Sequence, residues 1–71
     1  MKLYENKSGS SGVVAYETGK DFIRVKFTDG NPYTYSYKSA GEKHVKIMKK
    51  LAVKGKGLAT YISKYVKGLY E

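Results

Sequence analysis

The sequence contains no cysteine, one histidine and one proline. Without cysteine the chain has no disulfide, no thiolate metal ligand and no cysteine nucleophile, and with His44 as its only imidazole a zinc site is not expected. No run approaches the roughly 20 apolar residues of a membrane span, and no apolar segment of the signal-peptide kind follows Met1-Lys2. These absences predict a soluble, cytoplasmic protein with no metal and no cofactor.

Acidic residues are also scarce. Six Asp and Glu stand against 14 Lys and Arg in 71 residues, for a formal net charge of +8. Residues 1–37 carry five cations and four anions, whereas residues 38–71 carry nine lysines against Glu42 and Glu71. A one-sided cationic half indicates an anionic partner such as nucleic acid, a nucleotide or a lipid surface, and solubility alone is the alternative explanation.

A chain of this length is one domain, and its pattern predicts an α+β fold. The Ser- and Gly-rich stretch at 7–12 is linker-like, so residues 1–12 are predicted to be a flexible N-terminal segment and residues 13–71 the domain. Three strand patterns separated by turn residues, at 13–17, 22–27 and 33–37, predict a three-stranded antiparallel meander.

The hydrophobic period then changes to that of helices. Ser39 and Glu42 fit a capping box before a helix that ends at the Gly55–Gly57 break. A second helix follows, and both are expected to pack on one face of the sheet (β-β-β-α-α). The predicted buried stripe of the first helix is Val45, Met48, Leu51 and Ala52; that of the second is Leu58, Ile62, Tyr65, Val66 and Leu69.

The role of Tyr33, Tyr35 and Tyr37 depends on the hairpin register. A two-residue Asp29-Gly30 loop would place them beside Arg24 and Lys26 on an outer face, where they could stack on bases. The corresponding pairs are Lys26 with Tyr33, Arg24 with Tyr35 and Phe22 with Tyr37. A three-residue loop would instead put them in the core, with pairs Phe27–Tyr33, Val25–Tyr35 and Ile23–Tyr37. We favour the core, because Thr34 and Ser36 alone would leave that side of the strand too small.

Catalytic patterns are missing from the sequence. His44 lies beside the apolar stripe of the first predicted helix, and the acidic residues are scattered without the spacing of a paired-carboxylate site. The Gly55–Gly57 break could cradle a phosphate, but it lacks the spacing of a P-loop and is better explained as a helix stop. We therefore expect a binding module and not an enzyme.

Taken in order, several short motifs resemble the KTSC domain, a small module named after the C-terminal region of some lysyl-tRNA synthetases. They are Ser10-Ser11, Tyr16, Ile23-x-Val25-x-Phe27, Gly30, Tyr33-x-Tyr35, Gly55, Ile62 and Tyr65. The chain departs from that family at Tyr37-Lys38, where Val-Pro is usual, and after Gly55, where aromatics are usual. The resemblance implies a small bacterial or phage protein, and RNA binding by association with the synthetase.

These observations favour a module that binds nucleic acid, most simply RNA, through a lysine-rich helix face. The predicted contacts are Lys43, Lys46, Lys49, Lys50, Lys54, Lys56, Arg24 and Lys26, with Tyr33, Tyr35 and Tyr37 as stacking or ligand contacts. Two alternatives remain open: an oligomer that encloses a small nucleotide-like anion, and a protein-interaction or self-assembly module. A membrane-surface role ranks last, because the apolar helix face is needed to cover the sheet.

Overall fold

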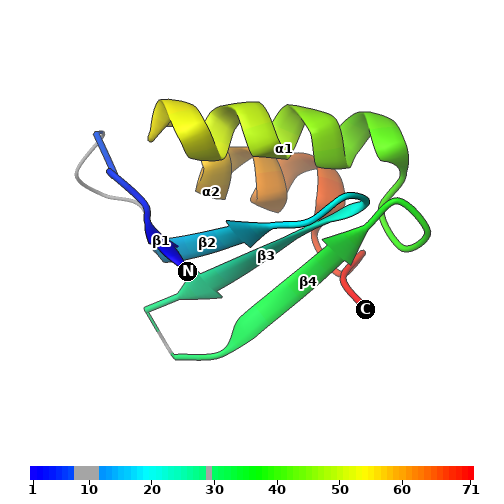
Figure 1. The fold of residues 1–71 in the computed structure, drawn as a ribbon, viewed down its shortest axis with the longest axis horizontal. Helices are drawn as coiled ribbons and strands as arrows, with labels where there is room; N and C mark the ends of the chain where they lie inside the picture. The colour runs from blue at the N-terminus through cyan, green and yellow to red at the C-terminus, as the bar shows by residue number, and fades with distance from the viewer. Residues whose placement is uncertain (8–11, 29) are drawn as a thin grey trace.

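A computed structural model describes residues 1–7, 12–28 and 30–71. An antiparallel sheet forms one layer, and the helices form a second layer on one of its faces (Figure 1). The strands are β1 (Lys2–Leu3), β2 (Val13–Thr18), β3 (Phe22–Phe27) and β4 (Pro32–Ser36), in the order β1-β2-β3-β4. The helices are α1 (Glu42–Lys54), α2 (Leu58–Tyr61) and a π-helix, η1 (Ile62–Val66). The predicted α+β class is confirmed.

The sheet has one strand more than predicted. Lys2 and Leu3 pair with Tyr16 and Ala15, so the start of the chain forms β1 at the edge of the meander. Tyr4 follows as a core residue with 6% of its surface exposed. The prediction of three strands was therefore wrong by one strand, because a two-residue strand leaves no readable alternation. The linker-like residues 8–11 lie outside the described part of the chain.

The β3–β4 register differs from both predicted pairings. Val25 lies opposite Tyr33 and Ile23 opposite Tyr35, which gives a longer connection than either tight turn. The shift from the three-residue loop is two positions, so the tyrosines still share the face of Ile23 and Val25. The core placement that we favoured is confirmed, and the outer stacking platform is excluded. Only the outward residues, among them Arg24 and Lys26, lie on the uncovered face of the sheet.

Tyr35 is the central tyrosine of this core. Its side chain is 2% exposed, and Tyr33 and Tyr37 pack at the margin of the core. Burial, followed by the nearby Tyr70 and Tyr33 hydroxyls, raises the pKa of Tyr35 to about 12, so its phenol is neutral at ordinary pH. Near the chain end, the Tyr70 ring packs on those of Tyr33 and Tyr35 at 4.7 and 6.1 Å. The aromatic run of β4 therefore stabilises the fold.

Helix α1 covers the sheet with the predicted apolar face. Val45, Met48 and Ala52 are buried, and Leu51 packs at the margin. The predicted capping box is wrong. Gly41 occupies the cap position with a φ of 97°, and among the described residues no side chain caps this helix. Ser39 is used earlier, where it and Ser36 exchange hydrogen bonds between backbone N–H and hydroxyl, both 3.0 Å long.

The second helical segment is not one regular α-helix. A four-residue α2 passes directly into the five-residue π-helix η1. Its buried residues are Leu58, Ile62 and Val66, each four positions apart, and the wider i→i+5 turn keeps that spacing on one face. Tyr65 and Leu69, predicted to be buried, are instead 57% and 40% exposed.

Gly55 joins the N-terminal segment to the end of α1. Its φ is +79°, its N–H bonds to the carbonyls of Leu51 and Ala52, and its own carbonyl accepts a 2.7 Å hydrogen bond from the Lys7 N–H. A Cβ at this position would lie 2.7 Å from the Cβ of Glu5. Glycine is thus required both by the left-handed backbone and by the close approach of residues 5–7.

Replacing Gly55 by Ala is expected to lower the free energy of unfolding by about 2 kcal/mol, since a left-handed strain adds to a clash. Gly57→Ala is the matched control: its φ is +85°, but the added Cβ would meet only Leu51 at an ordinary 3.8 Å. We expect about 1 kcal/mol there. Urea unfolding of both variants measures the difference, and equal losses would show that residues 5–7 do not pack on Gly55.

Candidate functional site

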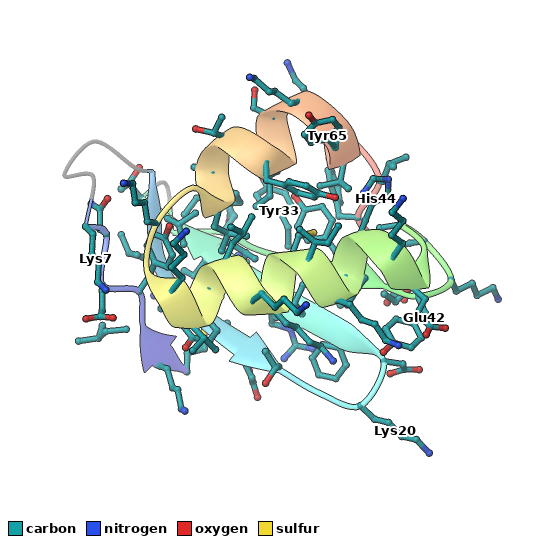
Figure 2. All side chains as sticks on the ribbon, turned by 90° about the horizontal axis from the view of Figure 1, so that it is seen from above. Lys7, Lys20, Tyr33, Glu42, His44 and Tyr65 are labelled. Carbon is teal, nitrogen blue, oxygen red and sulfur yellow. The ribbon has the colours of Figure 1, made fainter. Side chains whose placement is uncertain are left out.

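The solvent face of α1 carries most of the predicted lysine contacts. Helical periodicity places Lys43, Lys46, Lys50 and Lys54 opposite the buried stripe, and all four are exposed. We call these four residues the lysine face. Helix α1 has five lysines and one glutamate in 13 residues, so its charge is strongly one-sided. Figure 2 looks down on the helical layer, with α1 in front of the sheet.

Internal ion pairing neutralises little of this charge. In the part of the chain that the structure describes, the ion pairs are Arg24–Glu17 and Lys46–Glu42. The Lys46–Glu42 contact is 2.6 Å long, links adjacent turns of α1, and raises the pKa of Lys46 through the hydrogen bond. Lys43, Lys50 and Lys54 form no ion pair with any described residue. Their ammonium groups are therefore available to an external anion.

Two of the side chains predicted to contact nucleic acid, Lys49 and Arg24, instead bind other groups of the protein. Lys49 leans from α1 onto the β2–β3 turn, where its Nζ donates to the carbonyls of Gly19 at 2.6 Å and Lys20 at 3.3 Å. Arg24 lies on the uncovered face of the sheet, where its guanidinium donates to Thr34 and pairs with Glu17. Both side chains act within the fold, and Arg24 is separated from the lysine face by the sheet itself.

Replacement of Lys49 by Met is expected to lower the free energy of unfolding by about 1–2 kcal/mol, because two carbonyls lose a charged donor while the aliphatic stem is kept. Lys50→Met removes the same charge from the neighbouring solvent position and should change stability by less than about 0.5 kcal/mol. Thermal or urea unfolding of both variants decides between the two roles. Equal stabilities would contradict the structural role of Lys49.

The remaining predicted contacts are dispersed. Lys26 is exposed on the uncovered side of the sheet with Arg24, and Lys56 is exposed in the connection between α1 and α2. Tyr33 and Tyr35 of β4 face the core, so the structure does not bring them to the lysine face, whereas Tyr37, just after β4, has its ring centroid 5.7 Å from Lys49 Nζ. The possible phosphate cradle in the Gly55–Gly57 break is partly occupied, because the Gly55 N–H caps α1 and the Leu58 N–H donates to the Tyr4 hydroxyl at 3.2 Å.

An aromatic cluster that sequence reasoning missed lies between α1 and the second helical segment. We define it as His44, Tyr61 and Tyr65. The Tyr61 and Tyr65 ring centroids are 4.7 Å apart, and the His44 ring is nearly parallel to that of Tyr65 at 6.4 Å. A 2.6 Å hydrogen bond joins His44 Nδ1 to the Tyr61 hydroxyl. In Figure 2, Tyr65 lies on the second helical segment and His44 near the start of α1.

The chemistry of the cluster is that of a rigid aromatic surface. Tyr61 is half-buried between the helices, and burial, with a smaller effect from Tyr65, raises the pKa of its hydroxyl. The Tyr61 hydroxyl is hydrogen-bonded to His44, while Tyr65 is open to solvent. The four-residue spacing of Tyr61 and Tyr65 was a usable signal, but Tyr65 was predicted to belong to the buried stripe of the second helix. The cluster depends on the meeting of two helices.

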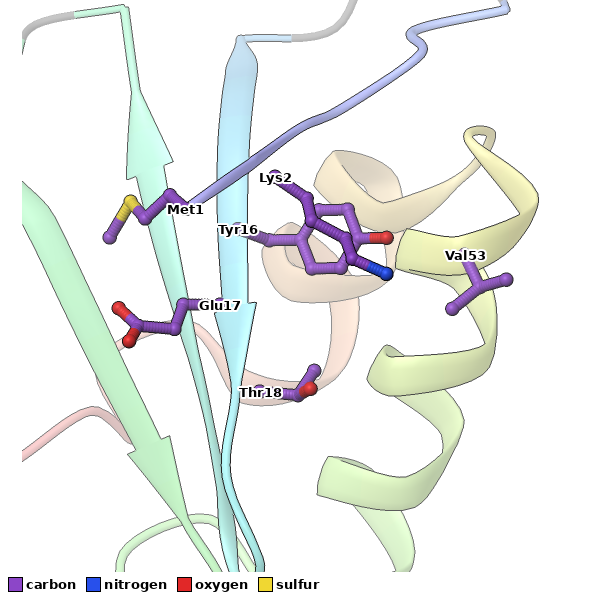
Figure 3. Close-up of a pocket in the computed structure, with 6 residues that line it drawn as sticks. All are labelled: Met1, Lys2, Tyr16, Glu17, Thr18 and Val53. Atoms are coloured by element: carbon purple, nitrogen blue, oxygen red, sulfur yellow. The ribbon is translucent and has the colours of Figure 1, made fainter.

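A pocket of about 420 Å³ lies at the edge of β2 beside the start of β1. Its lining residues are Met1, Lys2, Tyr16, Glu17, Thr18 and Val53. Figure 3 shows Lys2, Tyr16 and Val53 on the helix side of β2, with Met1 and Glu17 on the other side. Its two charged groups therefore do not converge on one ligand position, and we rank this pocket below the helical surface as a binding site.

Comparisons with known proteins add no assignment. The chain was compared with protein-family models, with curated proteins and with solved structures, and none of the three comparisons found a match. The resemblance to the KTSC domain therefore stays a prediction. None of the helices in the described ranges is long and apolar enough to cross a membrane. Residues 1–7, 12–28 and 30–71 also contain no group of three or more His, Asp or Glu placed to hold a metal ion.

Proposed function

We propose that this protein is a non-enzymatic module that binds RNA through the lysine face of α1. The observation that carries the proposal is the row of Lys43, Lys50 and Lys54, exposed on one side of a rigid helix and without ionic partners among the described residues. Phosphates of a nucleic-acid backbone suit such a row, because each bound ammonium releases a condensed counterion.

The kind of cation favours backbone contacts over base recognition. Lysine is a flexible point charge, whereas the planar fork of arginine is the usual reader of a base edge. The only arginine, Arg24, is engaged with Thr34 and Glu17 on the other side of the sheet. We therefore propose binding with little dependence on base sequence. This agrees with the RNA-binding role that the resemblance to the KTSC domain implies.

The packing of α1 on the core also supports a binding role for the lysine face. Val45, Met48 and Ala52 anchor the opposite side of α1 in the core, so the lysine positions are held in fixed relation to one another. A preformed row loses less conformational entropy on binding than cations on a flexible tail would lose. The 3.6-residue period brings these lysines to the same side on successive turns, where a single strand could follow them.

Fluorescence anisotropy with a labelled single-stranded RNA of mixed sequence tests the proposal. Three to five phosphate contacts predict a log–log salt slope of about −2 to −3.5. Affinity should then fall by about 20-fold to 100-fold between roughly 50 and 200 mM salt. Absence of binding at the lower salt overturns the proposal. A rise in melting temperature with a mononucleotide, without binding of the polymer, would instead favour the small-ligand alternative.

A further inference from the structure

We propose that the aromatic cluster of His44, Tyr61 and Tyr65 is a base-stacking platform, and that the module consequently prefers single-stranded RNA to duplex RNA. The inference rests on the proposed RNA binding and assigns the class of RNA. Its starting point is Tyr65, a large aromatic side chain that is 57% exposed although it lies between the buried residues Ile62 and Val66.

The exposure of Tyr65 follows from the π-helix. The i→i+5 turns of η1 keep Ile62 and Val66 on the core side and leave Tyr65 at the outer rim. Single turns of π-helix are rare and occur frequently at functional sites. If Tyr65 served only to fill the core, a regular helix would have buried it in the stripe with Leu58 and Ile62. The wider turn instead presents its ring to solvent.

The Tyr65 ring also packs against the rings of Tyr61 and His44. Tyr61 lies 4.7 Å from Tyr65 with an interplanar angle of 43°, and the His44 ring is inclined by only 22° to it. The 2.6 Å hydrogen bond between His44 and Tyr61 connects α1 to the second helical segment and orients both rings. A ligand that stacks on Tyr65 therefore meets a preorganised surface, which reduces the entropy cost of binding.

Charges flank the platform on both helices. Lys64 precedes Tyr65 and is exposed, and Lys43, the first residue of the lysine face, precedes His44. Half-buried Ile47 lies one turn from both Lys43 and His44, so it connects the lysine face to the cluster. The combination of a cationic groove with aromatic side chains on which bases stack is typical of proteins that bind single strands. The charge argues for an RNA ligand over an apolar protein partner.

Single strands are favoured because the face of a base must be free. In a duplex each base is covered by its neighbours, and exposing one for Tyr65 would cost a few kcal/mol. Phosphates, by contrast, are accessible in both forms, so the lysine face by itself would bind either. A preference for single-stranded over duplex RNA therefore measures the contribution of Tyr65 and not that of the lysines.

The test measures the affinity of the full chain for a 12-nucleotide single-stranded RNA and for a duplex of the same length at one salt concentration. Tyr65→Ala should weaken single-strand binding by about 10-fold and leave duplex binding within about 2-fold, since stacking on one base contributes roughly 1–3 kcal/mol. Tyr65→Phe keeps the ring and should retain affinity. Tyr70→Ala is the matched control, an exposed tyrosine beside β4 that should not change the preference.

Equal affinity of the native chain for the two RNA forms, or an unchanged single-strand affinity in Tyr65→Ala, overturns the stacking platform. If RNA binding remains and depends on the lysine face, the proposed function stands while this inference fails. If no RNA binds, both fail. Loss of self-association in Tyr65→Ala, seen by sedimentation with RNA affinity unchanged, would identify the cluster as a protein contact and also overturn the proposal.

Discussion

A Tyr4→Ala variant is expected to lose about 3–4 kcal/mol of its free energy of unfolding, which is a large share of the roughly 4–10 kcal/mol that a 71-residue domain possesses. Tyr4 is 6% exposed and belongs to the main core cluster. Its hydroxyl accepts a 3.2 Å hydrogen bond from the Leu58 N–H at the start of α2. The ring thus connects the N-terminal segment to the second helical segment, 54 residues later.

Two further variants separate the contribution of the Tyr4 ring to stability from that of its hydroxyl. Tyr4→Phe keeps the ring and should lose only about 1 kcal/mol, for the hydrogen bond to Leu58. Leu3→Ala, at a neighbouring side chain that is 83% exposed, should change stability by less than about 0.5 kcal/mol. Urea unfolding of the three variants measures the losses. A Tyr4→Ala variant as stable as Leu3→Ala would show that the segment is a flexible extension, as the sequence alone suggested.

A triple variant, Lys43→Gln with Lys50→Gln and Lys54→Gln, is expected to bind single-stranded RNA about 100-fold more weakly at roughly 50 mM salt. Loss of three phosphate contacts should reduce the magnitude of the log–log salt slope by about 2. The substitutions lie on the solvent face of α1 and form no ion pair with a described residue. The melting temperature should therefore change little, and the weaker binding would reflect the lost charges.

The matched control removes the same charge from another place. Lys2, Lys20 and Lys26 are exposed and lie in β1, in the β2–β3 turn and in β3, outside α1, and their triple replacement by Gln leaves the lysine face unchanged. We expect it to weaken RNA binding by less than about 5-fold, through the general field alone. Anisotropy titrations of both triple variants provide the comparison. Equal losses would mean that net charge, and not the lysine face, determines the affinity.

The elements with strong local patterns were predictable. The alternation of Ile23, Val25 and Phe27 indicated β3 with the bounds that the structure has, and the spacing of Val45, Met48 and Ala52 indicated the buried face of α1. The same helical periodicity separated the lysine face from the core. The size of the side chains also predicted that Tyr35 faces the core, because Thr34 and Ser36 alone would leave the core of a small domain underfilled. In each case the information lay within one element, either in its period or in the size of its side chains.

Features that depend on contacts between distant segments were missed. Strand β1 is two residues long, and its place in the sheet depends on β2 and on the docking of Tyr4 and Lys7 near α2 and Gly55. Lys49 is a lysine of α1 like the residues of the lysine face, yet its ammonium donates to two carbonyls of the β2–β3 turn. The Ser39 cap failed because Ser36 provides a competing local partner.

The sequence by itself determined the class of fold, the concentration of positive charge on one helix and the exclusion of thiol chemistry, since these follow from composition and from periods within single elements. The tertiary structure decided which cations are free, which tyrosines are exposed and where the chain begins to belong to the domain. Tyr35 and Tyr65 show the difference. Both occur in apolar patterns, but packing against the helices buries the first, and a π-turn turns the second toward solvent.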